Sequence, residues 1–144
     1  MDAADFIDFA GKMAAPNNSV PAQYRSAVSR AYYGCFHLAK ELLGELRFHC
    51  KNRENEHQYV QRHFQNCKEE VAKSLGGTLS DLHEYRKQAD YQLADMDAET
   101  HNFATTCLIM AHEIRSKLQT CRNSATLATV TKEMLQYRKD ARIQ

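Results

Sequence analysis

Apolar residues recur along this chain at the spacing of a helix, and no stretch alternates apolar and polar residues as a half-buried strand would. The clearest element covers about residues 21–46, where apolar residues fill about half of a helical wheel. They are Tyr24, Ala27, Val28, Ala31, Tyr32, Cys35, Phe36, Ala39, Leu42, Leu43 and Leu46. So broad an apolar face predicts contact with at least two neighbouring helices.

The same periodicity predicts further helices on both sides of this element. They cover residues 2–14 and 54–75, then a segment that begins near 80 and is separated by "DMDAE" (95–99) from a helix over 98–121. A helical tail begins at 124 and is expected to fray in "YRKDARIQ". Asn18 or Ser19 is expected to cap the helix that begins near Pro21, and "GGT" at 76–78 to end the third helix. The pattern predicts an all-α fold, an antiparallel helical bundle of four to five main helices plus short terminal helices. We expect one domain over residues 1–144, with 124–144 as an appended helix or tail.

Composition agrees with this fold and narrows the class of protein. The 144 residues are enough for one hydrophobic core, and only 5 glycines and 2 prolines favour helices over a turn-rich fold. The net charge of +1 gives no overall field that would attract nucleic acid or a membrane, although a local basic patch is compatible with it. Five scattered cysteines without a Cys-x-x-Cys pair are typical of a reduced cytosolic protein. No apolar run approaches the roughly 20 residues that span a bilayer and no signal peptide is evident, so we expect a cytoplasmic protein without a membrane partner.

One arginine interrupts the apolar stripe of the fourth predicted helix. Arg86 falls within the stripe that Leu79, Leu82, Ala89 and Leu93 define. Asp90, four residues on, can pair with Arg86, whereas Tyr91 lies roughly 140° around a straight helix and converges only if the helix ends or bends there. The residues alone fit a structural Arg–Asp pair, or an arginine held for a phosphate or a developing anion.

A second group of polar residues lies on the helix over 21–46, opposite its apolar side. Arg30, Tyr33 and His37 form a column at positions i, i+3 and i+7. An exposed ridge of this composition could contact RNA, a second subunit or a partner helix, and it could equally be an ordinary solvated face.

No metal or cofactor site is predicted. His63 and Cys67 have the i, i+4 spacing of a zinc-chelating pair, with His57 upstream, but no further ligand pair completes the set. The chain also lacks a Gly-rich phosphate loop and a nucleophile elbow.

Two motifs together resemble the HEPN family of small all-α domains. The stretch "YRSAVSRAYYGCFHLAKELL" (24–43) is followed by "YRKQADYQ" (85–92), so that "S-A-x-S-R-A-Y-Y-x-x-F-H" precedes "R-x-x-A-D-Y" as in a bacterial branch of that family. The resemblance implies a homodimer with an arginine-bearing helix from each subunit at a shared cleft. It also implies metal-independent ribonuclease activity in a toxin–antitoxin, anti-phage or CRISPR-linked system, with a nucleotidyltransferase-type antitoxin or another defence protein as partner.

The family's usual signature is an arginine, four to six residues and then a histidine. The histidine moves protons during attack of the ribose 2′-hydroxyl, while the arginine stabilises the charged phosphorane. In this chain Arg86 matches the arginine, but Tyr91 stands where the histidine is expected, and a tyrosine titrates near about 10. His83, three residues before Arg86, is a candidate substitute. In the toxin–antitoxin version, Tyr91 is also our candidate for modification by the antitoxin.

The resemblance assigns two groups of candidate residues and leaves three functions open. The candidate catalytic residues are Arg86, Asp90, Tyr91 and His83, and the candidate RNA- or partner-binding residues are Arg30, Tyr33, His37 and Lys87. The chain could be a ribonuclease or toxin, a non-catalytic HEPN module that binds RNA, a nucleotide or a protein, or a structural dimeric subunit.

Overall fold

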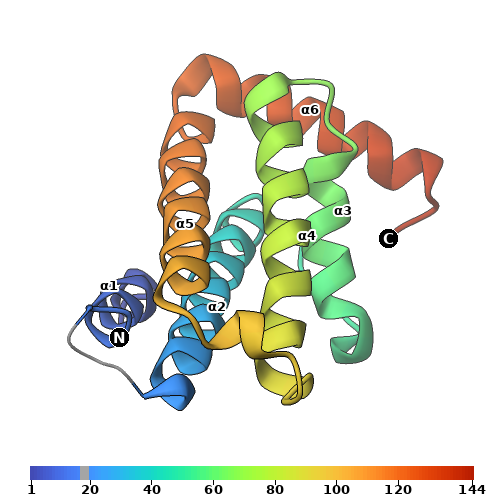
Figure 1. Ribbon diagram of the computed structural model, residues 1–144. Helices are drawn as coiled ribbons and strands as arrows, with labels where there is room; N and C mark the ends of the chain where they lie inside the picture. Colours follow the sequence, from blue (N-terminus) through green and yellow to red (C-terminus); the bar gives the residue numbers. More distant parts are fainter. Residues whose placement is uncertain (17–19) are drawn as a thin grey trace.

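The chain folds as a bundle of α-helices (Figure 1). The structure is a computed structural model that describes residues 1–16 and 20–144, so the expected caps Asn18 and Ser19 lie outside the described residues. Over these ranges it contains six α-helices and two short 3-10 helices and no strand, which confirms the predicted all-α class. The elements are α1 (Ala4–Met13), α2 (Pro21–Glu45), η1 (Arg53–Asn55), α3 (Glu56–Gln65), α4 (Glu70–Tyr91), η2 (Met96–Glu99), α5 (His101–Cys121) and α6 (Ser124–Asp140).

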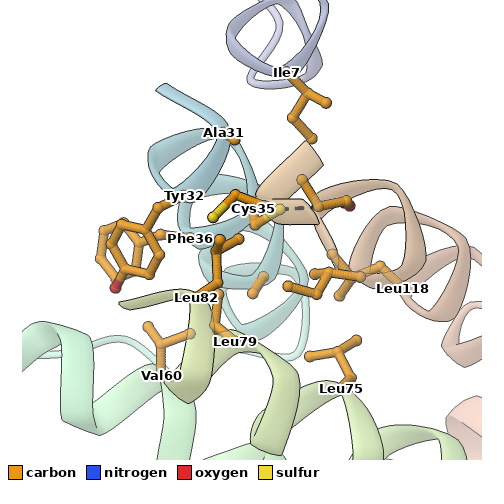
Figure 2. Close-up of a cluster of buried hydrophobic side chains, with 14 of the residues drawn as sticks. Ile7, Ala31, Tyr32, Cys35, Phe36, Val60, Leu75, Leu79, Leu82 and Leu118 are labelled. Atoms are coloured by element: carbon orange, nitrogen blue, oxygen red, sulfur yellow. Dashed lines mark hydrogen bonds between the residues drawn. The ribbon is translucent and has the colours of Figure 1, made fainter. Parts of the chain in front are cut away.

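Helix α2 is the central element and contacts α1, α3, α4 and α5. Of the apolar positions predicted for it, all except Leu46 are buried, and Leu46 follows the last helical residue. Figure 2 shows buried side chains of this core, which include Phe36 of α2, Val60 of α3, Leu79 of α4 and Leu118 of α5. The broad apolar face thus has the several helical neighbours that its width predicts.

The boundary between the third and fourth helices was predicted wrongly. The break falls after Gln65 rather than at "GGT", and α4 runs through both glycines. A Cβ added at Gly76 would lie 2.6 Å from the backbone nitrogen of Gln65, so this glycine permits α3 and α4 to approach closely. The start of α4 is fixed instead by a carboxylate of α6, because Glu133 accepts the backbone N–H groups of Lys68 and Glu69 at 2.7 and 3.0 Å.

Helix α6 lies across one end of the bundle (Figure 1). It remains helical through Asp140, although its basic final segment was expected to fray, and it buries Val130 and Met134. Among the residues that the structure describes, no helix combines the length and apolar character needed to cross a bilayer.

Candidate functional site

Arg86 of α4 points toward α2, and its side chain is only 11% exposed. Its Nη2 donates to the hydroxyl of Tyr33 at 2.5 Å, and its guanidinium carbon lies 4.8 Å from the centre of the Tyr33 ring. The ring centre of Tyr91 lies 5.3 Å from the same carbon, with the Tyr91 hydroxyl 3.4 Å from Nη2. Because α4 ends at Tyr91, the i and i+5 side chains meet, and the guanidinium contacts two tyrosine rings.

The charge of Arg86 is balanced by Asp90. The Asp90 Oδ2 atom lies 2.9 Å from Arg86 Nε and also accepts a hydrogen bond from the Ser29 hydroxyl at 3.1 Å. This ion pair is not a hydrogen bond, because the Nε hydrogen is not directed at the carboxylate. Within residues 1–16 and 20–144, Arg86 Nε is the buried side-chain nitrogen without a hydrogen-bond partner. A buried donor in this state calls for an explanation, and the charge of Asp90 at 2.9 Å offsets part of its cost.

A second arginine, Arg25 of α2, fixes the end of α4 in position. It is 8% exposed and donates to the carbonyls of Ala89 at 2.8 Å and Asp95 at 2.6 Å, and to the Glu99 carboxylate at 3.0 Å. The carbonyls that an ending helix leaves unpaired are thereby satisfied, and the positive charge suits a helix C-terminus. Arg25 was not among the predicted site residues, yet it holds the backbone on which Asp90 and Tyr91 stand.

Because α4 ends at Tyr91, one residue that was predicted to lie in the core does not lie there. Leu93, assigned to the apolar stripe, follows the end of α4 and is 71% exposed. Its carbonyl oxygen accepts a hydrogen bond from Arg25 at 3.3 Å.

Two imidazoles from different helices stack beside Arg86. His57 of α3 and His83 of α4 have ring centres 4.8 Å apart and an interplanar angle of 20°. Phe36 lies against His57 at 4.4 Å, and Tyr32 against His83 at 4.8 Å. The Tyr32 hydroxyl is hydrogen-bonded to His57 Nδ1 at 2.6 Å, and the Gln61 amide nitrogen to His83 Nδ1 at 3.0 Å. His57 was not among the residues predicted for this site.

Both stacked imidazoles are neutral at pH 7. Burial, followed by the charges of His57, Lys87 and Arg86, lowers the pKa of His83 to about 4. Burial, and next the charge of Arg86, also lowers the pKa of His57. The pKa of the buried Tyr32 hydroxyl is raised by desolvation, so this group stays protonated. The cluster therefore offers neutral nitrogens, which can accept a proton, next to a fixed positive charge.

The predicted ridge on α2 is not the exposed face that was expected, since Arg30, Tyr33 and His37 are all half-buried. Arg30 lies between the rings of Phe6 and Tyr33, with centre distances of 5.4 and 5.3 Å. The His37 ring stacks on Phe6 at 6.1 Å. Packing of α1 covers this side of α2, and Tyr33 is shared between Arg30 and Arg86.

Lys87, the remaining candidate for RNA or partner binding, lies on α4 beside Arg86. Its ammonium is 2.7 Å from the Glu84 carboxylate, and its side chain is 42% exposed. An exposed pair of this kind is weak and can exchange its partner for a phosphate.

The His63–Cys67 pair lies elsewhere and is engaged in the fold. Tyr59 presents a carbonyl to His63 Nδ1 at 2.7 Å, and Arg138 presents an N–H to His63 Nε2 at 3.2 Å. Since a carbonyl only accepts and a guanidinium only donates, both nitrogens are in use. The Cys67 thiol contacts the His63 carbonyl at 3.4 Å, and burial raises its pKa to about 12. No group of three metal-ligating side chains occurs in the part of the chain that the structure describes.

Comparison with known proteins returns no relative. No protein-family model matches the chain, and neither a curated protein nor a solved structure does.

Proposed function

We propose that this chain is a HEPN-like, RNA-directed ribonuclease, a toxin-like component of a toxin–antitoxin or anti-phage and CRISPR-linked defence system. It acts through a dimer cleft centred on Arg86. The observation that carries the proposal is the state of the Arg86 guanidinium: it contacts two tyrosine rings, keeps a buried Nε–H without an acceptor, and lies near neutral imidazoles.

The chemistry of this cluster suits an RNA phosphate. The planar guanidinium fork matches phosphate oxygens, and a positive charge at this point stabilises the phosphorane that forms during cleavage. Tyr91 is 70% exposed, which leaves ring surface on which an unpaired base can stack. Asp90 and Ser29 hold the arginine in place, and Lys87 can add a phosphate contact.

The surroundings of the site are compatible with a second subunit. Tyr91, Leu93 and Met96 are 70%, 71% and 75% exposed and follow one another around the end of α4. Apolar side chains grouped beside a functional site are typical of contact surfaces. A homodimer joined here would bring two copies of Arg86 together in the cytoplasm, and a nucleotidyltransferase-type antitoxin is the proposed heterologous partner.

A specific observation favours a second candidate, a HEPN module that binds RNA, a nucleotide or a protein without cleaving it. Tyr91 occupies the signature position of the histidine, and a tyrosine is a poor general base at neutral pH. In a third reading, the Arg86–Asp90 pair only fixes the register of a structural dimer, a role that such pairs play in some proteins.

One experiment separates the three candidates. Labelled single-stranded RNA is incubated in EDTA with the wild-type chain, Arg86→Ala, and the control Arg62→Ala, which changes an exposed arginine on α3. Cleavage by wild type and control alone, with 2′,3′-cyclic phosphate ends, supports the ribonuclease. RNA retention that requires Arg86, without cleavage, supports the binding module. Neither effect, with Arg86→Ala shifting dimers to monomers, supports the structural subunit.

A further inference from the structure

His57, like His83, is a titratable group of the site that neither quoted motif contains. It is the second residue of α3, two residues after the end of η1, and reaches the cluster between α2 and α4. The ring of Tyr33, on which Arg86 lies, is 6.1 Å from the His57 ring, centre to centre. Three helices thus converge on one imidazole and one guanidinium.

The two nitrogens of His57 have different surroundings. Its Nδ1 faces the hydroxyl of Tyr32, which is fully buried, and its ring lies between Phe36 and His83. These contacts fix the plane and the direction of the ring. The hydrogen bond of the ring is made at Nδ1, and the residue as a whole is half-buried, so we assign Nε2 to the ligand. The arrangement resembles a positioned general base, whose second nitrogen is held by a hydrogen bond.

We propose that His57 transfers the proton in RNA cleavage at this site, and that His83 is a positioning residue that holds the His57 ring. The inference rests on the proposed ribonuclease function and fills the role that the signature histidine leaves vacant. With Nδ1–H donating to the Tyr32 hydroxyl oxygen, His57 Nε2 accepts the proton of the ribose 2′-hydroxyl as the 2′-oxygen bonds to phosphorus. The bond from phosphorus to the 5′-oxygen breaks, this oxygen takes a proton from water, and the imidazolium returns its proton to the resulting hydroxide.

The other candidate bases fit this role less well. His83 Nδ1 already accepts a hydrogen bond from Gln61, and its pKa of about 4 makes it a weaker base. The Tyr32 hydroxyl is buried, and His37 stacks on Phe6 at the far side of Tyr33.

The charged and titratable groups around His57 come from all three helices. They are His37, Tyr32 and Tyr33 on α2, Glu56 on α3, and His83 and Arg86 on α4. Burial and the Arg86 charge outweigh Glu56, so the pKa of His57 is lowered and the base stays available in mildly acidic solution.

The test uses His57→Asn, because asparagine can keep a hydrogen bond to Tyr32 but cannot transfer the proton. Its matched control is His112→Asn, at an exposed position on α5. We expect His57→Asn to lower the single-turnover cleavage rate at least about 100-fold. RNA affinity should stay within about twofold of wild type, and the control should cleave normally. His83→Asn should slow cleavage to a smaller extent and shift the acidic limb of the pH–rate profile, which in wild type lies below pH 6.5.

The outcomes separate this inference from the function on which it rests. Arg86-dependent cleavage that His57→Asn leaves within threefold of wild type overturns the role of His57 and leaves the ribonuclease standing. A parallel loss of affinity and rate in His57→Asn makes His57 a binding residue and also overturns the inference. If the wild-type chain cleaves no RNA in EDTA, the ribonuclease proposal and the role of His57 both fail.

Discussion

Helix α3 carries a histidine near each end, and the two ends differ in almost every respect that matters for function. His63 is fully buried and both of its ring nitrogens are hydrogen-bonded. His57 is half-buried and has one nitrogen held by a buried hydroxyl. Each histidine lies near an arginine and a tyrosine, so residue types alone do not distinguish the two clusters.

Arg138, near His63, and Arg86, near His57, differ in how many of their donors are hydrogen-bonded. Arg138, beside His63, donates to the Tyr59 hydroxyl at 2.7 Å, to His63 Nε2 and to the Gln144 carbonyl at 2.5 Å. Arg86 has a buried Nε without an acceptor. The hydrogen bonds of Arg138 hold α6 against α3, whereas Arg86 lies beside the exposed ring of Tyr91. One end of α3 therefore stabilises the fold, and the other end is the proposed site.

The largest expected effect is a difference in the free energy of unfolding between variants of His63 and of His57. We expect His63→Ala to lower the free energy of unfolding by about 3 kcal/mol, because it leaves a cavity and removes an acceptor from Arg138. His57→Asn should cost less than about 1 kcal/mol, because the residue is half-exposed. Urea denaturation followed by circular dichroism measures both. Equal losses in the two variants would show that His57 is as structural as His63.

A somewhat smaller effect tests the packing that positions α3. We expect Gly76→Ala to destabilise the protein by about 2 kcal/mol, because the new methyl group would meet the Gln65 backbone at 2.6 Å. Gly77→Ala is the matched control: no atom lies within 4 Å of its added Cβ. Alanine there should raise stability by about 0.5–1 kcal/mol through helix propensity. Thermal unfolding of the two variants checks the pair, and a neutral Gly76→Ala contradicts the close approach.

The smallest effect is a dependence of stability on pH. Burial, the main cause, and the Arg138 charge lower the pKa of His63 below 6.5, against the opposing hydrogen bond to the Tyr59 carbonyl. The unfolded chain then binds more protons as the pH falls below 6.5, so stability is full above that pH and is lost below it. We expect His63 to contribute part of this loss as the pH falls from 6.5, up to the limit of about 1 kcal/mol that one proton can contribute between pH 6.5 and 5.5. The loss should shrink in His63→Gln, and an unchanged slope in that variant refutes the assignment.

The sequence predicted the elements that follow a regular period and missed the contacts between them. The face of α2 and the inward direction of Arg86 follow from helical spacing, and both are confirmed. Gly76 was read as a helix stop because a glycine that permits close packing and one that ends a helix look alike in a sequence. Leu93 was placed in the core because the spacing of the stripe does not reveal where α4 ends.

Arg25 and His57, the two site residues that were not predicted, differ in the signal that the sequence carries for them. Arg25 carried a detectable signal, since it lies three residues before Val28 and seven before Tyr32 on the apolar face of α2. An arginine on such a face needs several acceptors, which the end of α4 provides. His57 carried no comparable signal, because its partners come from helices more than twenty residues away in the sequence. Only the fold brings them together.

The proposed ligand site lies at the His57 end of α3, whereas the His63 end is structural. The most direct test of this difference is a titration of the ¹⁵N-labelled chain with a short single-stranded RNA, observed through the imidazole signals in long-range ¹H–¹⁵N spectra. We predict saturable shifts of the His57 and His83 signals, an unchanged His63 signal, and loss of these shifts in Arg86→Ala. Shifts at His63 alone, or no shift at His57 when RNA is bound, would contradict the account.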